Sequence, residues 1–440
     1  MAYGGGTWLF QNKVLPGTYI NFVSLARAIV SLADRGYVAM AMELDWGVDG
    51  EVFTVENSDF QKNSLKIFGY SYDHEKMKGL RDLFSNAKTV YCYKLNEGSK
   101  ASNDLATAKY AGERGNSIKI TVAVNVDAPT MFDVTTLLDN KKVDVQTVKT
   151  AKDLVNNDFV DFKTGATLTP TVAKPLENGT NDGTNGSAVT GTEYQKFLDK
   201  IETYYFNTLG CLATDETIKK LYIQFTKRMR DEVGAKFQTV VYRGAYADHE
   251  GVISVENKTI SKDDKESSAV YWVTGAEAGC PVNKSVSNKV YDGDFTFEFK
   301  ENQTALENGI KAGKFLFHKA DNKPVVLTDI NTFTSITVDK NDDFTSNQVI
   351  RVLDQIAVDI AKLFNKSFVG KVDNDEDGRV SLKDNIVDHH KELQRVRAIE
   401  NFVAEDVTVE KGKDKKSVLV TDKVTPVAAM EKLYMSVIVA

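Results

Sequence analysis

The last residues of the chain follow a period of two. Along 433–439 the side chains fall on two sides of an extended backbone, and one side consists of Leu433, Met435, Val437 and Val439. This period predicts a strand. An apolar strand with open edges is an aggregation hazard, so we expect this one to be paired. Its partner lies either in the same subunit or in a neighbouring one.

A second strand without a local partner is predicted near the start of the chain. It follows Pro16-Gly17, and Thr18, Ile20 and Phe22 share one face of it. Farther along, 407–409 and 418–420 flank a polar turn, which predicts a hairpin able to receive both strands. The residues that would make these contacts, within one subunit or between subunits, are Thr18, Tyr19, Ile20, Phe22, Val407, Val409, Val418, Val420, Leu433, Met435, Val437 and Val439.

Between these ends, buried strands alternate with amphipathic helices. The nearly all-apolar run 37–44 predicts a strand buried on both faces, and a helix at 73–84 and a strand at 89–95 follow it. This β–α–β order is typical of an α/β layer. The rhythm resumes after residue 193, with helices at 194–202, 215–233 (N-cap Thr214), 269–278 and 305–311, strands at 205–212 and 238–242, and a hairpin of 314–318 with 325–328.

The texture differs between residues 101 and 190. Residues 117–126 alternate strictly, and Asp139-Asn140 lies between two alternating runs, which predicts a hairpin. The stretch 178–187 has no apolar side chain and predicts a loop. We expect an inserted β-rich domain.

The C-terminal part predicts two helices, a hairpin and the terminal strand. Thr345 and Gln348 form a capping-box pattern before the first helix. The predicted fold class is α+β multidomain: an α/β core with an inserted β-rich domain and a C-terminal α+β domain bearing extended terminal strands. The bounds are an N-terminal linking arm at 1–30, the core at 31–100 and 191–340, the insertion at 101–190 and the C-terminal domain at 341–440.

Composition narrows the function. The 440 residues are 42% hydrophobic and 27% charged, as in a globular protein with a substantial core. A net charge of −7 argues against a general nucleic-acid binder. No apolar segment approaches bilayer-spanning length, and no signal peptide is recognisable. The three cysteines are far apart, which fits buried thiols in a reducing compartment better than disulfides or a zinc site.

The loop at 373–378 matches the first half of a calcium-binding EF-hand loop. Asp373, Asp375 and Asp377 stand at the first ligand positions, but position twelve is Asp384 rather than the bidentate Glu of the motif. The alternative is a solvated turn between two helices, where Asp, Asn and Gly are common. We favour that alternative and expect no bound metal.

Two further motifs resemble functional sites less closely. Gly309–Lys314 lacks the spacing of a phosphate loop and has Phe315 where Ser or Thr binds magnesium, so it is expected to end a helix with Gly313 at C′. His389-His390 has no metal-ligand pattern around it, so we expect a pair that faces solvent or a partner. Lys391, Arg395 and Arg397 make the same helix basic, usually a solvated face and otherwise a surface for a negatively charged partner.

The chain resembles contractile phage tail sheath proteins, of the type found in phages and tail-like bacteriocins of Gram-positive bacteria. The resemblance is strong from Gly309 onward. It is carried, in this order, by Pro16–Phe22, Gly309–His318, Asp329–Ser335, Asn365–Arg379, Glu392–Phe402 and Val427–Val439.

The resemblance implies a structural subunit. Such proteins stack as hexameric discs around a rigid tube, link neighbours by terminal arms that add strands to a C-terminal hairpin, and contract without nucleotide. It implies partners in a tail tube protein and in baseplate and tail terminator proteins, no cofactor, assembly in the host cytoplasm, and a place in a virion tail or extracellular particle. Lys391, Arg395 and Arg397 are our candidates for the tube-facing side.

Two other function classes stay open from the sequence. An α/β enzyme with a β-rich insertion would be monomeric and would bind a small molecule, and abundant carboxylates leave an acid–base pair conceivable. A calcium-binding adhesin would rest on the Asp373 loop alone.

Overall fold

The structure is a computed structural model that describes residues 32–181, 189–260 and 264–439. The chain forms two compact units. One comprises Ala33–Val358 and Pro426–Ala440 and is called the body; the other includes Asp359–Thr425 and is called the hairpin unit. The predicted arm at 1–30 lies outside the described residues, so its strand at 18–23 stays a prediction.

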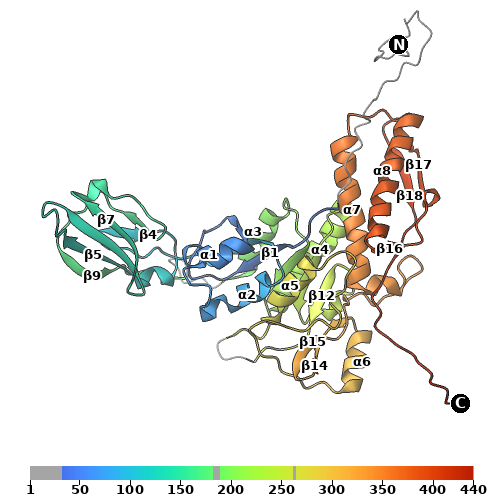
Figure 1. Cartoon of the computed structure of the whole chain (residues 1–440), viewed down its shortest axis with the longest axis horizontal. Helices are drawn as coiled ribbons and strands as arrows, with labels where there is room; N and C mark the ends of the chain where they lie inside the picture. Colours follow the sequence, from blue (N-terminus) through green and yellow to red (C-terminus); the bar gives the residue numbers. More distant parts are fainter. Residues whose placement is uncertain (1–31, 182–188, 261–263, 440) are drawn as a thin grey trace, which may run out of the picture. The chain divides into compact units, whose positions relative to one another are not determined.

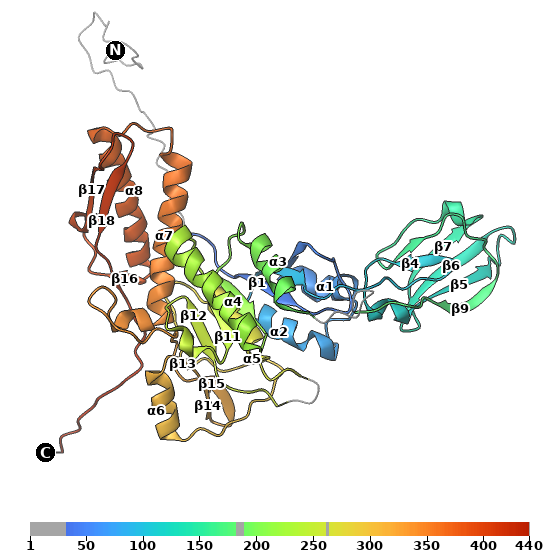
Figure 2. The same ribbon diagram turned by 180° about the vertical axis from the view of Figure 1, so that it is seen from behind.

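A seven-stranded sheet forms the centre of the body (Figures 1 and 2). Its order is β13-β12-β11-β10-β1-β3-β2, and all neighbours are parallel except the edge strand β2, which runs antiparallel to β3. The strands are β1 (Tyr37–Met42), β2 (Val52–Glu56), β3 (Thr89–Lys94), β10 (Thr208–Cys211), β11 (Gln238–Tyr242), β12 (Val252–Val255) and β13 (Lys314–Phe315). The predicted strands at 37–44, 89–95, 205–212 and 238–242 are thus confirmed, with shorter bounds for three of them.

Helices cover both faces of this sheet, which explains why β1 is apolar at consecutive positions. Met40 packs into one core with side chains of α1 (Asn57–Phe68), α2 (Lys78–Phe84) and α5 (Ala269–Gly279). Ala39 packs into the opposite core with α3 (Gly191–Ile201) and α4 (Glu216–Lys227). Parallel strands need such cover because both of their faces are removed from water.

The β-rich stretch contains a four-stranded antiparallel sheet and a two-stranded pair. Its elements are β4 (Ala106–Ala108), β5 (Ile118–Val124), β6 (Phe132–Leu138), β7 (Lys141–Val148), β8 (Val160–Phe162) and β9 (Thr171–Pro175), with orders β7-β6-β5-β9 and β4-β8. The predicted hairpin is confirmed: Asp139 and Asn140 both have positive φ, as a two-residue turn requires. A separate core joins Ile120 and Val134 to Val160.

Some elements differ from their prediction. Strand β2 and helix α1 were missed, because the run 45–66 is mostly polar and α1 buries few side chains. The helix predicted at 215–233 consists of the α-helix α4 up to Lys227, followed by a π-helical turn from Arg228 to Val233. Its N-cap is Asp215 rather than Thr214. Asp215 caps the helix because its carboxylate accepts hydrogen bonds from the Thr217 and Ile218 N–H groups at 2.8 and 3.1 Å.

The segment around Gly313 was partly predicted. Helix α6 (Gln303–Lys311) ends there, and Gly313 adopts a φ of 66°, which fits the expected C′ position. Strands β14 (Phe317–Ala320) and β15 (Lys323–Val326) form the expected hairpin around Asp321-Asn322. Lys314 and Phe315 belong instead to β13 of the main sheet.

The hairpin unit contains most of the C-terminal elements. Helix α7 (Asn347–Ser367) contributes its second part, followed by α8 (Glu376–Arg395), β17 (Val407–Lys411) and β18 (Val418–Asp422). The two-residue strands β16 (Ile399–Glu400) and β19 (Thr425–Pro426) complete the elements. The capping box at Thr345 was wrong: Thr345 belongs to a preceding 3-10 turn, and Ser346 accepts from the Val349 N–H instead. Across the described ranges, no helix has the length and apolarity that crossing a membrane requires.

Candidate subunit-linking site

The β17–β18 hairpin brings the four predicted valines to one face. Val409 pairs with Val420, and Val407 and Val418 follow the same side of the antiparallel register. This face lies against α8, where Val407 is fully buried. The opposite face is more open, and Leu419 on it is 57% exposed. In the described part of the chain no third strand pairs with the hairpin, so both edges present unpaired backbone groups.

A buried chain of polar groups fastens this hairpin to both helices. His390 contacts Asp422 of β18 (Nε2–Oδ2 2.8 Å), and His389 contacts Asp359 of α7 (Nε2–Oδ2 3.0 Å). The two imidazoles meet through their Nδ1 atoms at 3.1 Å. The contacts thus run without a break from α7 through α8 to β18.

The expectation that His389 and His390 face solvent or a partner was therefore wrong. Both side chains are 0% exposed, because α8 turns them toward α7 and β18. The sequence shows the histidine doublet, but the acidic partners are 30 and 32 residues away, and no local spacing indicates them. The two histidines therefore have a structural role, because they connect α8 to α7 and to β18.

A pocket lined by both apolar and charged side chains lies at the turn end of the hairpin. Its volume is about 600 Å³. Phe364 and Phe368 stack at 6.1 Å in its lining, and Val418 connects it to β18. Apolar surface thus continues from the hairpin onto the neighbouring helix ends. An added strand with large side chains would find contacts beyond the hairpin itself.

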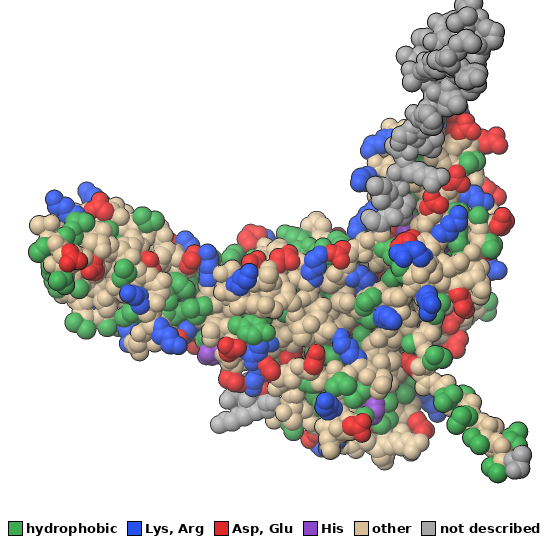
Figure 3. Space-filling model, in the orientation of Figure 1, with side chains coloured by type: hydrophobic (Ala, Val, Ile, Leu, Met, Phe, Trp, Pro, Cys, Tyr) green, Lys and Arg blue, Asp and Glu red, His purple; other side chains and the backbone are tan. Residues whose placement is uncertain are grey.

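The terminal segment is the apolar counterpart of this surface. From Val427 to Val439 the structure has neither strand nor helix. The large apolar side chains from Met430 to Val439 are between 74% and 101% exposed, and Figure 3 shows them along the tail that ends at C in Figure 1. We call residues 433–439 the tail. The predicted strand and its linking role therefore stay predictions, as does the role of Thr18–Phe22, which lies outside the described residues.

The basic residues proposed for the tube-facing side lie on or just after α8. Lys391, Arg395 and Arg397 are all exposed. Arg395 donates to Glu392 at 2.7 and 2.5 Å, and Lys391 lies 3.9 Å from Asp388. Two of the three charges are thus offset by carboxylates on the same helix. The assignment stays a prediction.

The acidic loop starts helix α8. Asp375 is its N-cap and accepts from the Gly378 N–H at 2.8 Å, and Asp377 lies in the first turn. The Asn374 side chain donates to the carbonyls of Lys415 and Ser417, which ties the loop to the hairpin turn. Within the described ranges, Asp373, Asp375 and Asp377 do not gather as a group that could hold an ion.

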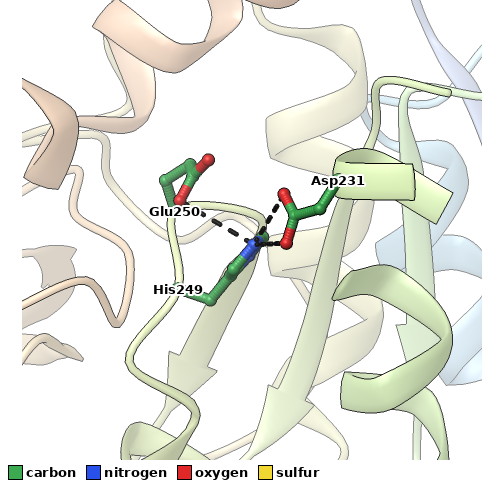
Figure 4. A group of neighbouring side chains, drawn as sticks. All are labelled: Asp231, His249 and Glu250. Carbon is green, nitrogen blue, oxygen red and sulfur yellow. Dashed lines mark hydrogen bonds and ion pairs between the residues drawn. The ribbon is translucent and has the colours of Figure 1, made fainter. Parts of the chain in front are cut away.

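A histidine between two carboxylates lies in the body (Figure 4). Nε2 of His249 is 3.1 Å from Asp231 Oδ2 and 3.9 Å from Glu250 Oε2. The Gly251 N–H donates to Nδ1 at 3.0 Å, so in the neutral ring the proton is on Nε2 and points at Asp231. Burial lowers the pKa of His249 despite both carboxylates. The ring is thus a hydrogen-bond donor here, and its Nε2 lone pair is not free for a metal.

A buried ion cluster joins α7 to α5 within the body. Arg351 donates to Glu277 at 2.6 Å and to Asp329 at 3.3 Å, and all three side chains are about 1% exposed. Burial raises the pKa of Glu277 well above its usual range. Burial acts likewise on Asp329, but Arg351 holds its pKa below the usual value. The three side chains thus form one buried, charged cluster. Sequence reasoning missed it, since its members are 22 to 74 residues apart.

Comparison with known proteins places these features in one family. Family models match along the chain: tail sheath protein Gp18 domain III N-terminal region at 35–95, phage tail sheath protein beta-sandwich domain at 96–182, phage tail sheath protein central domain at 187–332 and phage tail sheath C-terminal domain at 339–440. The phage-like element PBSX protein XkdK of Bacillus subtilis (strain 168) is 33% identical, over 98% of this chain and 99% of its own. The chain belongs to the phage tail sheath protein family.

Solved sheath proteins share the whole fold. The sheath tail protein of Desulfitobacterium hafniense is 37% identical with a TM-score of 0.83, over 95% of this chain and 99% of its own. That of Listeria innocua is 32% identical with a TM-score of 0.77, over 92% and 95%. The predicted resemblance is confirmed, and the β-rich stretch corresponds to a β-sandwich domain in a mixed α/β multidomain protein. The chain is a non-enzymatic, structural subunit of a tail sheath, and so a component of a phage tail or tail-like particle.

Proposed function

We propose that this sheath subunit polymerises as hexameric discs around a tail tube, and that the sheath contracts to drive the tube through a cell envelope. Terminal segments link the subunits: the tail and the strand at 18–23 each add to the β17–β18 hairpin of a neighbour. Contraction then moves the discs while these links hold. The further partners in this proposal are the tube protein, approached through Lys391, Arg395 and Arg397, and baseplate and tail terminator proteins. Assembly takes place in the host cytoplasm, without nucleic acid or membrane insertion.

One observation carries the linking step. A tail with almost fully exposed apolar side chains coexists with a hairpin whose edges are open in the described part of the chain. Adding the tail to the hairpin as a further strand would bury its apolar side chains and pair the open backbone groups of the hairpin edge. In strand addition, backbone hydrogen bonds supply affinity and alternate side chains supply specificity. The hairpin register supports this proposal. Val409 and Val420 form an apolar face, and every second residue of the tail is apolar in the same way. The proposed division of the chain is a linking arm at 1–30, a core at 31–100 and 191–340, an inserted domain at 101–190, and a C-terminal domain at 341–440.

The energetics favour a lattice over an isolated pair. Burying the four apolar side chains of one tail face gives roughly 6–10 kcal/mol gross. Ordering the segment costs roughly 1–2 kcal/mol per residue, so one arm alone is marginal. Several arms on one sheet stabilise one another once the first is ordered. Because donor and acceptor surfaces differ, the contact is heterologous and propagates.

Negative-stain electron microscopy of the purified full-length chain tests this function. At high protein concentration we expect hollow tubes, since every subunit carries both a tail and an acceptor hairpin. Sedimentation on the same sample should show large particles at the expense of monomer. A chain that stays monomeric at every concentration and salt condition would contradict the proposal.

A further inference from the structure

The tail is fastened to the body at its root. The Ala429 N–H donates to Oε1 of Gln348 at 2.9 Å. Two residues later, the Glu431 carboxylate accepts from the Thr328 hydroxyl at 2.8 Å and from the Ser287 hydroxyl. These bonds fix the point where the chain leaves the body and becomes the exposed tail.

The groups that hold Glu431 continue into the buried ion cluster. The Ser287 hydroxyl accepts from the Asp329 N–H at 2.9 Å, so its own proton is free to serve Glu431. Asp329 in turn contacts Arg351 through its side chain. Gln348 lies one helical turn before Arg351 on α7. A connected path therefore runs from the root of the tail to a buried cluster of charges in the body.

We propose that Glu431 is the anchor of the linking tail, a positioning residue that holds residues 427–431 on the body and passes a pull on the tail to the Asp329–Arg351 cluster. This inference rests on the proposed linking function. Without the anchor, five more residues would be free in the unassembled subunit and would have to be ordered at each contact. The anchor thereby both aims the tail and shortens its flexible length.

Three single variants of the full-length chain test the anchor. Glu431→Ala removes both acceptor oxygens, and Glu431→Gln keeps one of them. Lys432→Ala is the matched control, because Lys432 is the next residue, is charged and exposed, and has no part in the bonds described. We expect Glu431→Ala to raise the critical concentration for tube formation about tenfold, Glu431→Gln to have a smaller effect, and Lys432→Ala to have none.

Amide hydrogen exchange separates anchoring from a general loss of stability. In unassembled Glu431→Ala, the Ala429 amide should exchange at least several-fold faster, while amides of the central sheet keep wild-type protection. The melting temperature of the body should stay within about 1 °C of wild type, because the bonds lie at the surface. Faster exchange throughout the body would contradict a positioning role.

The outcomes distinguish this inference from the function on which it rests. If a chain lacking the tail still forms tubes, the linking function fails, whatever Glu431 does. If tail removal abolishes tubes but Glu431→Ala matches wild type in both critical concentration and Ala429 exchange, the anchor alone is wrong. Faster Ala429 exchange with a raised critical concentration supports both.

Discussion

Removal of residues 433–440 is expected to leave a folded subunit that forms no tubes. The apolar side chains of 433–439 are 74% to 91% exposed in the single chain, so the body loses no packing with them. The proposed sheath loses the strand that crosses to its neighbour. Circular dichroism should match that of the full chain, and electron micrographs should show tubes for the full chain alone. The loss should be close to complete, because each subunit loses a donated strand.

A matched substitution controls for nonspecific effects on the tail. Ser436→Ala changes a small polar residue on the opposite side of the predicted strand and should leave tubes intact. Tubes of normal length from the truncated chain would exclude the tail as a necessary link. A truncated chain that aggregates or loses its circular dichroism would show instead that the tail belongs to the fold of the body.

Arg351→Met is expected to destabilise the body by about 3–5 kcal/mol, because it leaves the carboxyl groups of Glu277 and Asp329 buried without their cation. For a body of this size the melting temperature should fall by about 4–7 °C. Tryptophan fluorescence can follow the transition, since Trp46 and Trp272 are both buried in the body. The effect should grow as the pH rises, because burial raises the pKa of Glu277 and deprotonation adds a second negative charge.

Arg228→Met is the matched control for this loss. Arg228 pairs with Glu202 at 2.5 Å, but both side chains are more than a third exposed. Such a surface pair contributes about 0–1 kcal/mol, so the melting temperature should hardly change. Equal falls in melting temperature for the two substitutions would show that Arg351 does not stabilise the body more than a surface arginine does.

The sequence predicted several elements from their apolar pattern. The strand at 238–242 was found to the residue, because Val240, Val241 and Tyr242 form a short apolar run, whereas the fully buried β12 was missed. The hairpins at Asp139-Asn140 and Asp321-Asn322 were found because their turns need residues that tolerate positive φ. Strand β2 and helix α1 were missed because they lie at a sheet edge and on the surface, where polar residues are tolerated.

Contacts between distant residues could not be predicted in the same way. The His389-His390 pair was visible, but its burial depends on Asp359 and Asp422, which the fold brings together. The same holds for Arg351 and its two carboxyl groups. The hairpin that carries the proposed linking residues was predicted from the polar turn between its two strands. The register of the structure then places Val407, Val409, Val418 and Val420 on one face.

Cysteine cross-linking tests most directly whether the tail pairs with the hairpin of a neighbour. The native Cys92, Cys211 and Cys280 are all buried, so thiols introduced at Val420 and Val437 would react separately from them. Adjacent strands bring Cα atoms to about 5 Å, within reach of a disulfide. Oxidised assemblies of the double variant Val420→Cys/Val437→Cys should give a ladder of covalent oligomers on a non-reducing gel, and neither single variant should give more than a dimer. A covalently closed monomer would contradict the account, because the tail would then fold back on its own subunit.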